Sequence, residues 1–238
     1  MDDLWMMQEY YAAYLRNIRQ LSESSVEHYF DALRWISRFL CEKGLISKSI
    51  FEVADLFQLQ VLRDALYSDQ GFMEMNRRGH QMYSSGMNNY LRFAEGQDFS
   101  KLNQQLTLLD RPMPAPKEAC SVHDTWKRSA IIRDQVLIAA EYQCEISPSH
   151  KTFIQNKTNH QYAEGHHIIA LSNQRSIPRS LDIYANIICL CPLCHRFLHY
   201  GNRHDKMPVV GLLYSKRADR LAQSGIRLSQ REFENMVL

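Results

Sequence analysis

The segment "EGHHIIALSNQRSIPRSLDIYANIICLCPLCHRFLHYG", residues 164–201, holds four of the chain's ten histidines and three of its six cysteines. Imidazole and thiolate are the side-chain groups that bind zinc most readily. Cys191 and Cys194 have the C-x2-C spacing that lets two thiolates on one tight turn reach a single ion. The fold must therefore bring further ligands to this turn, and that requirement constrains it more than any other feature of the sequence.

A structural zinc ion takes four protein ligands, so the C-x2-C pair needs two more. Cys144, in "CEISPSH", is another cysteine among polar, turn-forming residues. A second C-x2-C would need a cysteine at position 147, where the chain has Ser147. His150 follows a proline turn and can fold back toward Cys144, while His160 is an alternative for the fourth place. The predicted structural zinc site is Cys144, His150, Cys191 and Cys194.

The other cysteines are expected to be ordinary thiols. Cys189 alternates with Cys191 in the apolar stretch "IICLC", which is typical of a buried strand residue, and Cys41 and Cys120 have no partner in sequence. Six cysteines in 238 residues are too few for a disulfide scaffold. The start "MDDLWMMQEY" is unlike a leader, and no apolar run is long enough to span a membrane. We therefore expect a cytoplasmic protein with no membrane partner.

Basic charge is concentrated in the second half of the chain. Residues 1–120 hold 13 Lys+Arg and 16 Asp+Glu, a net charge of −3, whereas residues 121–238 hold 15 and 10, a net charge of +5. With 45% hydrophobic residues, the chain is long enough for one large or two modest domains. A polyanionic partner would more naturally meet the second half.

The first hundred residues have the spacing of helices. Apolar residues recur every three or four positions, and Ser24 with Glu27 indicates a capping box at the start of a helix. Three alternating prolines in "RPMPAPKEA" disfavour a helix and favour an extended spacer. The predicted organisation is a helical domain over residues 1–98, a proline-containing linker over 99–120, and a second domain over 121–238.

A closed zinc site leaves the four histidines of the opening segment without a role. His195 and His199 lie four residues apart after Cys194, so a helix beginning there would present both imidazoles on one side. His166 and His167 are adjacent in a stretch that has the pattern of a strand. Because neighbours on a strand point to opposite faces, one can bind a cation while the other acts on a substrate.

The stretch from about residue 141 to 201 resembles the HNH nuclease family, and in particular its zinc-containing branch of McrA-like bacterial restriction endonucleases. In the ββα-metal motif of that family, two strands and a helix hold one divalent ion. The matching residues are His167 for the first H, Asn186 for the N and His195 for the last H. The chain departs from the family pattern at Ser147 and in the loop before Asn186, which lacks the usual glycines.

The resemblance implies phosphodiester hydrolysis. His167 would be the general base, since a neutral imidazole with a pKa of about 6.5 can accept a proton at physiological pH. Asn186 would lie on the second strand and orient the chain around the base. His166, His195 and His199 would hold a catalytic divalent cation. Imidazole ligands suit Mn²⁺, Ni²⁺, Co²⁺ or Zn²⁺ better than Mg²⁺, so several metals are expected to serve.

The sequence thus predicts an α+β protein, in which an all-α N-terminal domain precedes a ββα-metal (HNH) domain with one structural Zn²⁺ and flanking helices. The expected function is a metal-dependent endonuclease on double-stranded DNA, of a bacterial restriction or anti-phage type. Because one such centre cuts one strand, a homodimer is the simplest route to double-strand cleavage. The expected phosphate contacts are Arg175, Arg179, Arg196 and Arg203.

Two alternatives stay open on the sequence. The chain could be a zinc-stabilised nucleic-acid-binding protein with an inactive HNH fold, or an HNH nuclease that is structure-selective or directed at RNA. The motif handles one phosphate and reads no sequence, so it does not separate these substrates.

Overall fold

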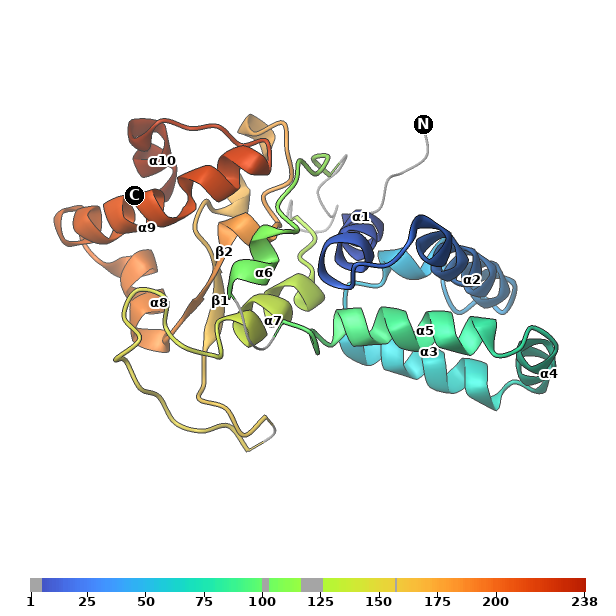
Figure 1. Cartoon of the computed structure of the whole chain (residues 1–238). Helices are drawn as coiled ribbons and strands as arrows, with labels where there is room; N and C mark the ends of the chain where they lie inside the picture. Colours follow the sequence, from blue (N-terminus) through green and yellow to red (C-terminus); the bar gives the residue numbers. More distant parts are fainter. Residues whose placement is uncertain (1–5, 100–102, 117–125, 157) are drawn as a thin grey trace. The chain divides into compact units, whose positions relative to one another are not determined.

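The computed structural model describes residues 6–99, 103–116, 126–156 and 158–238 (Figure 1). The chain divides into two compact units, Met1–Asp98 and Phe99–Leu238. Within the described residues the first unit is helical, and the named strands belong to the second. A mixed helical protein with a small sheet agrees with the predicted α+β class. In the described part of the chain, no helix has both the length and the apolar character needed to cross a membrane.

The first unit is built from helices and two short helical turns. In chain order they are α1 (Met6–Ala13), the π-helical turn η1 (Tyr14–Ile18), α2 (Glu23–Glu42), the 3₁₀ turn η2 (Ile50–Glu52), α3 (Leu56–Ser68), α4 (Gln70–Arg78) and α5 (Met82–Ala94). Ser22 caps α2, because its side chain accepts a hydrogen bond from the backbone N–H of Ser25. The predicted cap at Ser24 was therefore wrong by two residues.

The core of the first unit lies around the contact of α2 with α5. Gly86 permits this contact, since a Cβ atom there would lie 2.7 Å from the Cβ of Ala32. An aromatic cluster fills the neighbouring space, and the rings of Tyr11 and Tyr90 meet edge to face at 5.1 Å. Its fully or largely buried members are Tyr11, Tyr14, Phe30, Phe51, Tyr90 and Phe93.

The second unit combines helices with a two-stranded sheet. Its elements are α6 (Asn103–Thr107), α7 (Ala130–Ala139), β1 (Glu164–His167), the 3₁₀ turns η3 (Leu171–Ser176) and η4 (Tyr184–Asn186), β2 (Ile187–Leu190), α8 (Pro192–Tyr200), α9 (Arg203–Gln223) and α10 (Gln230–Val237). Ser229 and Glu232 form the capping box that begins α10.

Strands β1 and β2 are antiparallel, with Gly165 opposite Cys189 and His166 opposite Ile188. Helix α7 packs against both strands, and α8 follows β2 and packs against them as well (Figure 1). Gly165 allows α7 to approach, because a Cβ there would lie 2.5 Å from Cγ of Arg133. His166 of β1 and the two histidines of α8 are thereby brought to one place.

Residues 103–116, the described part of the stretch predicted to be a linker after Phe99, include buried side chains. Leu106, Leu109 and Met113 are buried, and the carbonyl of Met113 accepts a hydrogen bond from the backbone N–H of Ser180. The buried carboxylate of Asp110 forms an ion pair with Arg220 of α9, at 2.6 Å. The stretch begins with helix α6 and is not helical around its prolines, and its apolar side chains pack within the second unit.

Candidate metal centres

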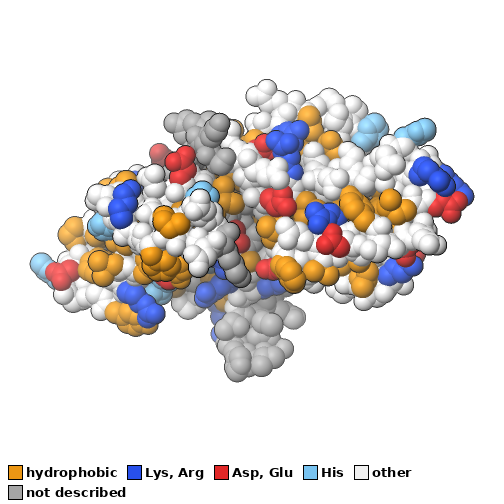
Figure 2. Space-filling model, turned by 90° about the horizontal axis from the view of Figure 1, so that it is seen from below, with side chains coloured by type: hydrophobic (Ala, Val, Ile, Leu, Met, Phe, Trp, Pro, Cys, Tyr) orange, Lys and Arg blue, Asp and Glu red, His pale blue; other side chains and the backbone are white. Residues whose placement is uncertain are grey.

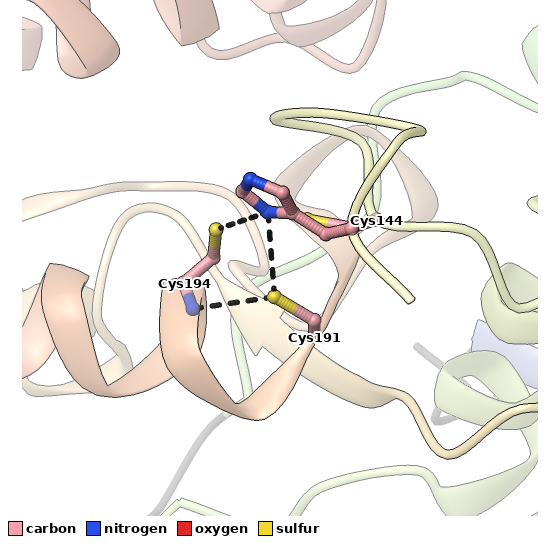
Figure 3. Close-up of side chains that lie close together, drawn as sticks. Cys144, Cys191 and Cys194 are labelled. Carbon is pink, nitrogen blue, oxygen red and sulfur yellow. Dashed lines mark hydrogen bonds between the residues drawn. The ribbon is translucent and has the colours of Figure 1, made fainter. Parts of the chain in front are cut away.

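Three cysteines and one histidine meet at the start of α8. Cys191 is the N-cap of α8 and Cys194 lies in its first turn, while Cys144 and His150 come from the loop after α7. One ligand atom from each residue lies within 4.8 Å of all the others. Nδ1 of His150 lies 3.2 Å from Sγ of Cys194 and 3.6 Å from Sγ of Cys191 (Figure 3).

Electrostatics at this cluster suit a cation. Burial acts against ionisation of Cys144, but backbone N–H groups of Cys191, Ser147 and Ile146 stabilise the thiolate and lower its pKa to about 7. Burial, together with the neighbouring thiols, raises the pKa of Cys194. A closely packed set of thiolates needs positive charge among them, and a closed Cys₃His set is one that structural zinc adopts. The residues present therefore fit zinc.

The remaining cysteines and the competing histidine lie elsewhere. His160 stacks on Tyr142 with ring centroids 4.5 Å apart and is outside the cluster. Cys189 is fully buried in β2, where burial raises the pKa of its thiol. Cys41 hydrogen bonds to the carbonyl of Lys48 in the first unit. Cys120 lies outside the described residues.

A second cluster consists of three histidines from β1 and α8. His195 and His199 lie one turn apart on α8, with their Nε2 atoms 3.3 Å apart. His166 of β1 meets both rings, at centroid distances of 5.0 and 4.9 Å. One nitrogen from each of the three lies within 4.8 Å of the others. His166 is buried, whereas His199 is exposed, so the cluster opens to solvent on one side.

Two imidazoles of this cluster, those of His166 and His199, have lowered pKa values that favour the neutral form. Burial, followed by the charges of His195, His199 and His167, lowers the pKa of His166 to about 3. Burial and the same kind of repulsion also lower the pKa of His199. Neutral imidazoles keep a lone pair for a metal, and three histidines leave coordination positions open, as catalytic zinc sites do. The residues present therefore fit a divalent transition metal.

Glu164 supports this cluster and was missed in the sequence. Its carboxylate pairs with Nδ1 of His195, and its other oxygen accepts a hydrogen bond of 2.9 Å from the hydroxyl of Tyr162. Ligating histidines commonly use their second nitrogen in this way, which fixes the ring and the tautomer. Glu164 stands two residues before His166 on β1, and that same-face spacing was the available signal.

His167 points away from the cluster and meets a buried carboxylate. Its Nε2 lies 2.8 Å from Oδ1 of Asp182, and Oδ2 of Asp182 accepts a hydrogen bond of 2.7 Å from the backbone N–H of Ser129. The alternation of His166 and His167 across β1 thus separates the two rings, as the sequence predicted. A carboxylate in this position orients an imidazole and stabilises its protonated form. No spacing in the sequence pairs Asp182 with His167.

Part of this chain is similar to a restriction enzyme. Over 99 residues, or 42% of its length, the chain is 29% identical to the type IV methyl-directed restriction enzyme EcoKMcrA of Escherichia coli (strain K12). The match covers 33% of that enzyme, so the chain spans about a third of its relative's length. No family model and no solved structure matches the chain.

Asn186 is buried, and its side chain hydrogen bonds to backbone groups. It ends η4, one residue before β2, rather than lying on the strand. Its side-chain amide donates to the carbonyls of Ile169 and Leu181, and its Oδ1 accepts from the N–H of Ile169. These bonds join the two ends of the loop between His167 and β2. Asn186 thus shapes the loop that carries Asp182.

The four predicted phosphate-binding arginines are exposed and come from several elements of the second unit. Arg196 of α8 lies over the ring of Tyr200, at 5.8 Å. Arg203 begins α9, Arg175 lies in the last turn of η3, and Arg179 lies three residues after η3 ends. Acidic and basic side chains alternate over the face shown in Figure 2.

Proposed function

We propose that this chain is a metal-dependent endonuclease that hydrolyses phosphodiester bonds in double-stranded DNA. One observation carries the proposal: a solvent-open cluster of three histidines from β1 and α8 lies next to His167, the following residue of β1, which is held by a buried aspartate. The similarity to a restriction enzyme supports the same class of reaction. We propose a restriction or anti-phage role on this basis, with a homodimer as the form that cuts both strands.

His167 is proposed as the general base. If its Nε2–H donates to Asp182, the tautomer is fixed and Nδ1 is free to take a proton from the attacking water. The Asp182 carboxylate then stabilises the imidazolium that forms. Asn186 maintains this geometry through the loop backbone and does not itself touch the reacting atoms.

His166, His195 and His199 would hold a divalent cation, and Glu164 would keep the His195 ring in place. When bound, such a cation supplies positive charge for the phosphate and the leaving oxygen. Cys144, His150, Cys191 and Cys194 would hold a structural zinc that fixes the start of α8. Because His195 directly follows Cys194, that zinc would set the position of the histidine cluster.

The test is a cleavage assay with supercoiled plasmid and phage DNA, each with and without methylated bases, supplied in turn with Mn²⁺, Co²⁺, Ni²⁺, Zn²⁺ or Mg²⁺. We expect nicking or linearisation by the native protein and a rate lower by roughly 10²- to 10⁴-fold for His167→Ala. His204→Ala is the matched control, because its side chain is 99% exposed and lies outside both clusters. DNA binding without cleavage under every metal would favour the inactive, zinc-stabilised alternative.

A further inference from the structure

The chain between the two metal clusters forms a projecting ribbon, which we call the finger and define as residues 151–156 and 158–162. In Figure 1 it is the yellow segment that extends from β1 within the second unit. Two backbone hydrogen bonds hold its sides together: Gln155 N–H donates to the carbonyl of His160, and Tyr162 N–H donates to that of Phe153, both at 2.8 Å. The finger is thus an ordered ribbon where it is described.

Both ends of the finger are fixed beside the candidate metal centres. It begins directly after His150 of the Cys₃His cluster and ends two residues before Glu164. Its returning side is also anchored, since Gln161 donates a hydrogen bond to the carbonyl of Tyr142 and His160 stacks on the Tyr142 ring. The finger is therefore placed by the same elements that place the histidine cluster.

The finger exposes an aromatic ring that the second unit does not cover. Phe153 is 66% exposed and its neighbour Ile154 is 59% exposed. The Phe153 ring stacks on Tyr162 with centroids 5.0 Å apart and planes at 17°. Tyr162 in turn donates a hydrogen bond to Glu164, the partner of His195. A stacked pair with one open end thus lies within three side-chain contacts of a candidate metal ligand.

The composition around this ring favours a polyanion with hydrogen-bonding edges. Residues 146–163 contain no Asp or Glu, while Lys151 begins the finger. Asn and Gln side chains, which can pair with base edges, occupy the part near its tip, at Gln155, Asn156 and Asn159. Aromatic rings that stack nucleobases beside basic and amide side chains are a recurrent arrangement in nucleic-acid-binding proteins.

We propose that the finger contacts DNA and that the ring of Phe153 is a platform on which an unpaired or displaced nucleobase stacks, next to the phosphate to be cut. This inference rests on the proposed nuclease function and adds a recognition element to it. Stacking on Phe153 would extend the Phe153–Tyr162 pair by one ring. The duplex would then be held locally unstacked beside the histidine cluster, so distorted or unpaired DNA would bind better than a regular duplex.

The test uses the full chain carrying His167→Ala, so that binding is measured without cleavage. The probe is a DNA duplex with one unpaired 2-aminopurine, whose fluorescence falls when the base stacks on an aromatic ring. We expect Phe153→Ala to weaken binding roughly 5- to 100-fold and to abolish the quenching. Phe153→Tyr should keep both, whereas Phe153→Leu should lose the quenching although it stays apolar.

Phe57→Ala is the matched control, because Phe57 is 73% exposed and belongs to the first unit. The inference is overturned if Phe153→Ala binds and quenches like its parent, or if Phe153→Leu quenches fully. It is also overturned if Phe153→Ala only converts a dimer to a monomer at unchanged DNA affinity, since the finger would then contact a second copy. The melting temperature of each variant shows that it is folded.

The failures of the two proposals are distinguishable. If the native protein cuts DNA and Phe153→Ala binds the probe normally, the finger inference fails and the nuclease stands. If the protein binds and quenches the probe but cuts no DNA with any metal, the finger inference stands and the nuclease fails. If the protein neither binds nor cuts DNA, both fail.

Discussion

Helix α8 contributes to two ligand clusters that differ in what surrounds them. Its first turn provides Cys191 and Cys194 to a set of four ligands that is largely buried, whereas His195 and His199 join a set of three that opens to solvent. A closed four-ligand set leaves no position for water or substrate, and a three-ligand set leaves at least one. Under the proposed function, the first cluster provides stability and the second provides chemistry, although Cys194 and His195 are adjacent in the chain.

The largest effect is expected from breaking the closed cluster. Cys194→Ser should remove the structural metal and with it a binding free energy on the order of 10 kcal/mol, which is comparable to the whole stability of a domain. The second unit should then lose its cooperative unfolding transition. Metal content per chain and circular-dichroism melting measure the two outcomes.

Cys41→Ser is the control for that substitution, because Cys41 belongs to the first unit and to neither cluster. It should leave metal content and the melting transition of the second unit unchanged. A Cys194→Ser protein with full metal content and native melting would contradict the division between the two clusters.

The second prediction concerns a substitution that should slow cleavage and leave the fold intact. Asp182→Asn removes the carboxylate charge beside His167 but keeps the size of the side chain. Cleavage should fall roughly 10²- to 10⁴-fold, since an amide neither stabilises the imidazolium nor fixes the productive tautomer. Single-turnover cleavage and DNA affinity, measured side by side, should show the rate falling at nearly constant affinity.

Asp182 also accepts the backbone N–H of Ser129, so the substitution needs a structural check. Metal content and melting temperature close to those of the native protein would show that the effect is chemical. If the rate and the structural metal were lost to the same extent, Asp182 would serve the fold, and its proposed role in orienting His167 would be contradicted.

Local spacing made part of this site predictable. The C-x2-C pair and the H-x3-H pair each fall on a turn or helix whose geometry is set by a few neighbouring residues, so their convergence was foreseeable. Asp182 acts through a contact across the fold, which a single sequence does not encode at a fixed spacing, whereas Glu164 had the same-face spacing to His166 as its signal. The choice between His150 and His160 as the fourth ligand needed the structure, in which His150 lies in the cluster and His160 stacks on Tyr142.

The predicted helix cap was misplaced because the local signal was ambiguous. Ser22 and Ser24 are both competent helix caps, and the chain uses the first. The prolines before residue 117 disfavour a helix, but they do not predict whether an extended segment is buried against the rest of the unit. The segment is packed, as the burial of Leu106, Leu109 and Met113 shows. Their irregular spacing has no helical or strand period, so the sequence did not predict this burial.

The smallest effect is expected from a substitution beside the open cluster of three histidines. Glu164→Gln replaces the carboxylate that holds His195 by a neutral amide, so the ring loses its charged partner but keeps a hydrogen-bonding neighbour. Affinity for the divalent ion at the three histidines should fall about 10- to 100-fold, because outer-shell carboxylates orient ligands and raise their basicity. The structural metal should stay, since the Cys₃His cluster does not include Glu164. Titrating Mn²⁺ or Co²⁺ into the protein, with cleavage and total metal followed together, measures both sites.

Glu141→Gln, an exposed change on the same unit, should leave the metal affinity of both sites unchanged. A Glu164→Gln protein that needs no more added metal than the native one would mean that α8 alone fixes His195, and that the open cluster is held as rigidly as the closed one.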